Sequence, residues 1–234
     1  MIENTINSED FQKRHKESSK DFIRNTALSF KNLIAFFANL NKGSYETELK
    51  AFYKTINNQE VANPEVTKGA VSKARKKLKP SAFIELNEKT VQEYEQQAPL
   101  KTWYGMRPVG VDGSTVTVPD ETEIKEHFGV WEGRHGDPCP KARISQMFDV
   151  LNHITLDAII KPKSQGEREL AADHFLKLMP SDLVLLDRGY PAAWLFSLIL
   201  SLDANFCARV KISQWKVISV NYNTRLTTIK IPEI

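Results

Sequence analysis

Two aspartates stand out because each ends an apolar run and each precedes residues typical of a turn. Asp112 lies in PVGVDGSTVTVP (108–119), and Asp187 lies in LVLLDRGYP (183–191). A carboxylate at such a position can simply serve a turn or cap the next helix. Two such carboxylates, brought together from separate strands, can instead share a proton or hold a divalent cation. Both interpretations are open at this point.

The elements that must position these aspartates follow in the order strand, strand, strand, helix, strand, helix, strand. The sequence predicts strands over 108–119, 142–152, 154–162, 183–187 and 205–210, and helices over 166–178 and 191–201. Hairpins first and helical crossovers later are typical of a mixed sheet covered by helices, an α/β (α+β) fold. In such a sheet the first and fourth strands can be neighbours, about 5 Å apart.

Two carboxylates at that separation repel each other by roughly 3 kcal/mol at an effective dielectric constant near 20. We therefore expect either that one carboxyl group is protonated or that a divalent cation lies between them. Because every ligand would be an oxygen atom, Mg²⁺ or Mn²⁺ is favoured over Zn²⁺.

Residues 1–98 have a helical pattern and form a separate predicted domain. Helices are expected over 28–40, over 44–56 with Ser44 as the cap, from Thr67 to the residue before Pro80, and over 82–96 with Ser81 as the cap. The whole excess of positive charge of the chain lies in residues 1–100, and the segment 67–80 holds six basic residues and no acid.

A basic, exposed helix face suits the phosphate backbone of DNA, whereas the plain alternative is a solvated surface helix. We take Arg188, next to Asp187, as a further candidate for a phosphate contact. The candidate DNA-binding residues are Lys68, Lys73, Arg75, Lys76, Lys77, Lys79 and Arg188.

The composition argues against several other classes of protein. The longest apolar run, 192–202, is too short to span a bilayer and contains serines. The N-terminus lacks the apolar core of a secretion signal, and the two cysteines, Cys139 and Cys207, suit a reducing cytoplasm. We expect a soluble cytoplasmic protein without a membrane partner.

Taken together, these segments resemble the bacterial insertion-sequence DDE transposases of family four. The resemblance rests on an ordered set of segments rather than on one motif. The segments are VTKGAVSKARKKLKPSAF (66–83), VDGSTVTVPD (111–120), EIKEHFG (123–129), ARISQMFDVLNHITLDAII (142–160), QGERELAADH (165–174) and LVLLDRGYPAAWLFSLIL (183–200).

The resemblance implies a DNA-binding domain over 1–98, an RNase H-like catalytic domain over 105–212 and the start of a β-rich insertion over 213–234. It matches the first two catalytic acids of the family to Asp112, which would bridge two metal ions, and to Asp187, which would hold one of them. The implied reaction is nicking of double-stranded DNA at the ends of the element, followed by strand transfer into target DNA. A homodimer on DNA is a candidate assembly.

The third acid of the family is a Glu in a Tyr-x₂-Arg-x₃-Glu-x₆-Lys signature. This chain has Tyr222 and Arg225 at the first spacing, but Ile229 at the Glu position. We therefore expect the truncated front part of a longer transposase, which binds DNA but does not cut it alone. Two alternatives stay open: a catalytically dead DNA-binding remnant, and a metal-dependent nuclease whose third acid is Asp149 or Asp157.

Overall fold

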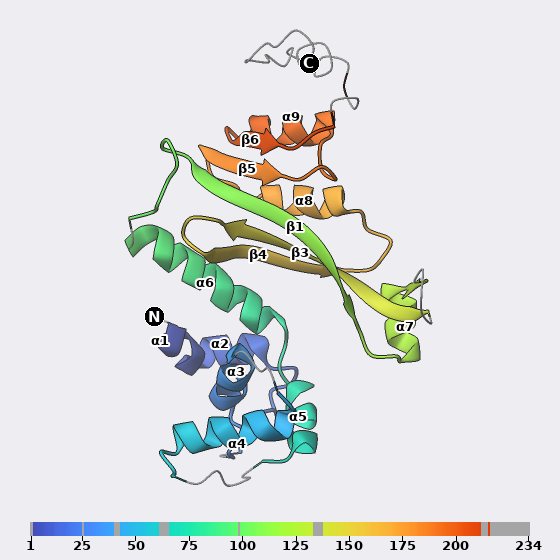
Figure 1. Cartoon of the computed structure of the whole chain (residues 1–234). Coiled ribbons are helices and arrows are strands. Elements are labelled where there is room, and N and C mark those ends of the chain that lie inside the picture. The colour runs from blue at the N-terminus through green and yellow to red at the C-terminus, as the bar shows by residue number, and fades with distance from the viewer. Residues whose placement is uncertain are drawn as a thin grey trace. The chain divides into compact units, whose positions relative to one another are not determined.

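The computed structural model (Figure 1) describes residues 2–24, 26–39, 43–60, 66–97, 99–132, 138–211 and 215. The predicted β-rich segment 213–234, apart from Trp215, lies outside the described residues, and so do Tyr222, Arg225 and Ile229. The chain divides into two compact units, Met1–Glu93 and Tyr94–Ile234. Within the described residues, no helix is both long enough and apolar enough to cross a membrane.

The first unit is helical, as predicted. Its helices are α1 (Ile2–Asn7), α2 (Glu9–His15), α3 (Phe30–Ala38), α4 (Tyr45–Ile56), α5 (Lys68–Arg75) and α6 (Ser81–Gln97), and α6 continues into the second unit. The predicted caps Ser44 and Thr67 are confirmed, because their side chains accept the backbone N–H groups of Thr47 and Ala70. Such caps satisfy donors that have no partner inside the helix.

Two predictions at the end of this unit are wrong, and both fail because of contacts with residue 15. Helix α5 ends at Arg75 rather than just before Pro80, because the N–H of Lys79 donates to the carbonyl of His15 (2.9 Å). Ser81 is the first residue of α6 rather than its cap, and its hydroxyl contacts His15 Nδ1 at 2.9 Å. Backbone pairing between distant segments thus replaces the local helix pattern.

The core of the first unit holds α5 in place through one side of the helix. Val71 is fully buried, and Leu78 beyond the helix end is 7% exposed. They join a cluster of aromatic rings in which Phe36 packs edge to face on Phe52, with the ring centres 5.5 Å apart. The basic residues Lys73 and Lys77 are consequently on the exposed side.

The second unit is a mixed sheet with helices, which confirms the predicted α/β (α+β) class. Its strands are β1 (Arg107–Thr117), β2 (Val130–Trp131), β3 (Cys139–Asp149), β4 (Ile154–Lys161), β5 (Asp182–Leu186) and β6 (Asn205–Ala208). Its other helices are α7 (Thr122–Phe128), α8 (Glu167–Phe175) and α9 (Ala193–Ser201). The sequence analysis did not anticipate α7 and β2.

The strands lie in the order β2-β3-β1-β5-β6, and β4 also pairs with β3. The pairs β1–β3, β3–β4 and β2–β3 are antiparallel, whereas β1–β5 and β5–β6 are parallel (Figure 1). The first and fourth predicted strands, which became β1 and β5, are therefore neighbours as expected. Helix α8 contacts β3 and α9.

A buried ion pair joins the first residues of β1 and β5. Arg107 and Asp182 are register partners, and the guanidinium Nε and Nη2 each donate to a carboxylate oxygen of Asp182 at 2.8 Å. The Nη1 atom also contacts Glu95 at 2.5 Å. Burial opposes the charge on Arg107, but the hydrogen bonds and charges of Asp182 and Glu95 outweigh it and raise the pKa of Arg107.

Replacing Arg107 by Ala is expected to lower the free energy of unfolding of the sheet unit by roughly 3–5 kcal/mol, because Asp182 would be left buried without a counter-charge. All four tryptophans of the chain lie in residues 94–234, so urea unfolding followed by Trp fluorescence reports this unit. The double variant Arg107→Met/Asp182→Leu should recover part of the loss. A loss below about 1 kcal/mol in the single variant would contradict the role of the pair.

Candidate functional site

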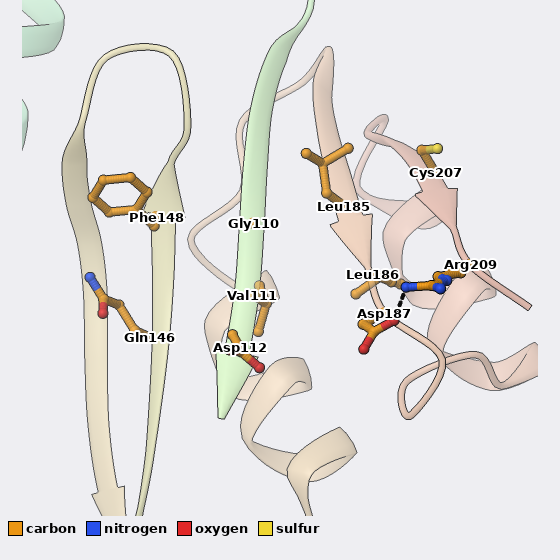
Figure 2. Close-up of a pocket in the computed structure, with 10 residues that line it drawn as sticks. All are labelled: Gly110, Val111, Asp112, Gln146, Phe148, Leu185, Leu186, Asp187, Cys207 and Arg209. Atoms are coloured by element: carbon orange, nitrogen blue, oxygen red, sulfur yellow. Dashed lines mark ion pairs between the residues drawn. The ribbon is translucent and has the colours of Figure 1, made fainter. Parts of the chain in front are cut away.

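The register between β1 and β5 brings Asp112 level with Asp187. The last paired residues are Gly110 and Leu185, so counting on by two residues in each chain segment reaches the two aspartates. Figure 2 shows the Asp112 side chain on β1, beyond the last residue that pairs with β5, and the Asp187 side chain just after the end of β5. The structure therefore brings together the two acids that the sequence analysis singled out.

Both aspartates line one cavity of about 700 Å³. Its walls come from β1, β3, β5, β6 and the residues that follow β5 and β6. The lining residues are Gly110, Val111, Asp112, Gln146, Phe148, Leu185, Leu186, Asp187, Cys207 and Arg209. Open α/β sheets bind ligands in the crevice beyond the carboxyl ends of their parallel strands, which is the position of this cavity.

Both carboxylates face solvent, which changes the electrostatic argument. Asp112 is exposed, and the side chain of Asp187 is 70% exposed. At the dielectric constant of water their repulsion is about 1 kcal/mol at strand separation, not the 3 kcal/mol expected for a partly buried pair. Repulsion alone therefore does not require a cation, and the case for a metal rests on the donor chemistry.

The contacts that the two carboxylates make are weak enough to be replaced by contacts with a cation. Asp112 Oδ1 accepts the N–H of Gly113 at 2.8 Å. Asp187 Oδ1 lies 3.9 Å from Nη1 of Arg209, and both of these side chains are mostly exposed. An exposed ion pair of that length contributes little to stability. Two carboxylates at one opening supply the oxygen ligands that Mg²⁺ and Mn²⁺ prefer.

Three residues beside the aspartates were missed by the sequence analysis. Tyr190 is 3% exposed, and burial, followed by the charges of Glu167 and Asp112, raises its pKa to about 12. Glu167 at the start of α8 is paired with Arg143 on β3 at 2.8 Å. No sequence signal could find this cluster, because its members come from three separate elements.

The cluster lies close to β1 at Gly113. A Cβ atom at Gly113 would lie 3.4 Å from Glu167 Cγ and 3.5 Å from the Tyr190 hydroxyl. These are ordinary van der Waals distances, so the cluster packs beside the residue after Asp112 without requiring a glycine there.

The two acids considered as a third metal ligand lie elsewhere. Asp149 is 1% exposed and accepts hydrogen bonds from the backbone and side-chain amides of Asn152 in the β3–β4 turn. Asp157 is buried against His174 and Lys177. Neither is among the described residues that line the cavity, so the nuclease alternative with Asp149 or Asp157 stays a hypothesis that the shape of this cavity does not support. Among the residues that the structure describes, no three His, Cys, Asp or Glu side chains are grouped to hold a metal ion.

A buried polar network lies behind Asp112. His174 is fully buried, with Nδ1 2.8 Å from Asp157 Oδ2 and Nε2 3.0 Å from the Ser145 hydroxyl. That hydroxyl lies 3.5 Å from the carbonyl oxygen of Asp112. Burial alone would raise the pKa of Asp157, but hydrogen bonds from His174 and Lys177 outweigh it and lower the pKa. The network links α8 to the strand that carries the acid.

The predicted basic residues are dispersed over more than one surface. Lys73 and Lys77 line a cleft of the first unit, whereas Lys68, Arg75 and Lys76 are exposed outside it. Lys79 reaches the carbonyl of Arg14 at 3.3 Å. Arg188 is exposed but does not line the cavity, where Arg209 is found instead.

In sequence, the chain is similar to a protein of the transposase class. The particular relative is the protein of Escherichia coli (strain K12) named "Putative transposase InsZ", which is 25% identical over 147 residues, or 62% of this chain and 48% of that protein. The chain thus spans about half the length of this relative. No protein-family model matches the chain.

Among solved structures, the chain has a likeness to the one described as "Cryo-EM structure of piggyBac transposase synaptic complex with hairpin DNA (SNHP)". The likeness covers 97% of this chain and 51% of the other, at 10% identity and a TM-score of 0.43. A likeness at that level carries no argument about function.

Asp157→Asn is expected to lower the free energy of unfolding of the sheet unit by roughly 2 kcal/mol at pH 7, because the charge-assisted bonds to His174 and Lys177 are lost. Since the folded state depresses the pKa of Asp157, its contribution is present above the ordinary value of 3.8 and disappears as the pH falls below it. Urea unfolding at several pH values should show the two proteins converging in acid. The exposed Asp173, next to His174 on α8, supplies the control Asp173→Asn. An equal loss in that variant would contradict the stabilising role of Asp157.

Proposed function

We propose that the chain is part of a DDE-type transposase that binds double-stranded DNA and carries two of the three metal-binding acids, Asp112 and Asp187. The observation that carries the proposal is that both acids line one cavity, each two residues beyond the last pair of the parallel strands β1 and β5. The similarity to a transposase in sequence supports it. The proposal includes an RNase H-like role for the sheet of the second unit.

The donor set fits a hard divalent cation. The carboxylates of Asp112 and Asp187 would hold Mg²⁺ or Mn²⁺, and Arg209 would move away from Asp187 on binding. When bound, such ions activate the attacking oxygen and stabilise the leaving oxygen of a phosphodiester. The chain itself would orient the scissile phosphate in the cavity, with Asp112 held from behind by the hydrogen-bonded pair of Ser145 and His174.

The first unit would supply the affinity for DNA. Exposed lysines and arginines attract phosphates without regard to sequence and release counterions on binding, so the affinity should fall steeply with salt. The proposed DNA-binding residues are Lys68, Lys73, Arg75, Lys76, Lys77, Lys79 and, in the second unit, Arg188. A homodimer on DNA remains a prediction.

The printed sequence contains no complete Tyr-x₂-Arg-x₃-Glu signature, and we take the partial match at Tyr222 and Arg225 as chance. We therefore propose that this chain by itself binds DNA without cutting it. The alternative role, a DNA-binding protein that occupies transposon ends without catalysis, makes the same prediction for cleavage but does not require Asp112 and Asp187 to bind metal.

Metal binding separates these two roles. We expect Mn²⁺ to bind the wild-type chain. We expect Asp112→Asn or Asp187→Asn to weaken Mn²⁺ binding at least about tenfold, because even changes to residues that only support metal ligands typically weaken metal binding about tenfold or more. Titration of free Mn²⁺ by electron paramagnetic resonance measures this. Asp120, an exposed acid paired with Lys125, gives the control Asp120→Asn. Equal Mn²⁺ binding in all four proteins, or none in the wild type, would exclude the metal site.

Cleavage is tested on a labelled duplex carrying the terminal repeats of the element. With Mg²⁺ or Mn²⁺ the chain alone should shift the duplex in a gel but leave both strands intact, because two carboxylates hold the second ion of a two-metal site poorly. Strand cleavage that disappears in Asp112→Asn would refute this expectation while supporting the acid's catalytic role.

A further inference from the structure

A second concave surface belongs to the first unit. It is a cleft of about 550 Å³ between the segment 20–28 and α5. Of the lining residues that the structure describes, four are cationic and none is acidic, and the remaining ones are apolar or carry a hydroxyl group. The lining residues are Lys20, Phe22, Ile23, Arg24, Thr26, Leu28, Ala70, Lys73, Ala74 and Lys77.

We infer that this cleft receives the sugar–phosphate backbone of double-stranded DNA, with Lys20 and Arg24 as phosphate-binding residues opposite Lys73. The inference rests on the proposed DNA-binding function and names the surface that performs it. Sequence reasoning placed the basic surface on α5 alone, because Lys20 and Arg24 precede that helix by more than forty residues.

The charges of the cleft are available to a ligand. Lys20, Arg24 and Lys73 are exposed, and none of them pairs with a carboxylate among the described residues. Lys77 differs, because it lies 3.5 Å from Asp21, whose side chain is 14% exposed. Three cations without counter-charges around one concave surface produce a positive potential that attracts a polyanion.

The segment that carries Lys20 and Arg24 is held in an unusual conformation. Phe22 has a φ of 55°, in the left-handed region that non-glycine residues seldom adopt. Its ring packs edge to face on Phe30 in the core, with the centres 5.5 Å apart. Because Phe22 is turned inward, Ile23 is left 69% exposed and Arg24 is also at the surface. Observed strain of this kind is often found at binding sites.

The chemistry of the cleft favours a duplex backbone over other anions. Ala70 and Ala74 form a low apolar floor that can lie against deoxyribose, while the cations around it meet phosphates. Single-stranded nucleic acid needs aromatic platforms, but among the described lining residues the one aromatic side chain is that of Phe22, which packs on Phe30. The exposed Lys68, Arg75 and Lys76 extend the positive surface beyond the cleft, which suits a long polyanion.

The test uses the full chain and a fluorescent random-sequence duplex, with affinity measured by anisotropy at several salt concentrations. Lys20→Gln/Arg24→Gln should weaken binding about tenfold and reduce the slope of log affinity against log salt by about 2, one for each lost phosphate contact. The matched control, Lys13→Gln/Lys54→Gln, removes the same charge from exposed positions outside the cleft and should change affinity by no more than about twofold.

A second variant, Ala70→Met, fills the floor of the cleft without changing charge and should also weaken binding, provided that its circular dichroism matches the wild type. If the wild type binds the duplex and the two double variants weaken binding equally, the cleft is not the DNA-binding surface, but the proposed function stays intact. Failure of the wild type to bind any duplex would overturn the DNA-binding function itself. Polyglutamate that binds as tightly as the duplex would overturn the assignment to DNA.

Discussion

The parallel pairing of β1 with β5 is the constraint on which the candidate site depends. Arg107 and Asp182 open the two strands as register partners, and five residues later each strand reaches an aspartate. A slip of one residue would turn the side chains of one strand to the opposite face, so the two carboxylates would no longer share a cavity. A buried ion pair is a modest source of stability compared with apolar residues of the same size, but its forked geometry is satisfied in one alignment only. The site requires this single alignment of β1 with β5.

The environment of the aspartates differs from that of the acids behind them. Asp112 and Asp187 are exposed at the opening, where a cation or a DNA phosphate can reach them from solvent. Asp157 and Asp182 are buried and paired with basic side chains, and they connect elements of the sheet unit. The same residue type thus performs two tasks, and burial decides which one. Tyr190 belongs to the inner group, since it is buried and burial is the main cause that raises its pKa to about 12.

The charged residues on the concave surfaces of the two units are mainly of opposite sign. The helical unit presents lysines and an arginine around an apolar floor, and the sheet unit presents carboxylates at a strand edge. In the proposed function, the first arrangement supplies affinity for phosphates and the second supplies ligands for a divalent cation, which lets acids approach a negatively charged backbone. A transposase-like chain needs both, because carboxylates alone would repel DNA.

Much of the fold could be predicted from the sequence, because the relevant signals lie within a few residues of one another. The caps Ser44 and Thr67, the hairpin after Asp149 and the apolar runs that lead to Asp112 and Asp187 all depend on local spacing. The order of the elements indicated that the first and fourth strands can be neighbours. The site could be predicted only as far as these two acids.

The rest was decided by contacts between segments far apart in the chain. His15 accepts the N–H of Lys79 beyond the end of α5 and contacts the hydroxyl of Ser81. Glu167 and Arg143 form an ion pair beside the acids. Lys20 and Arg24 line one cleft together with α5. The sequence by itself determined which residues are apolar, capped or charged, since those properties belong to single residues and their near neighbours. Only the tertiary structure determined which charges are buried, which are exposed and which face one another, because these depend on how distant segments pack.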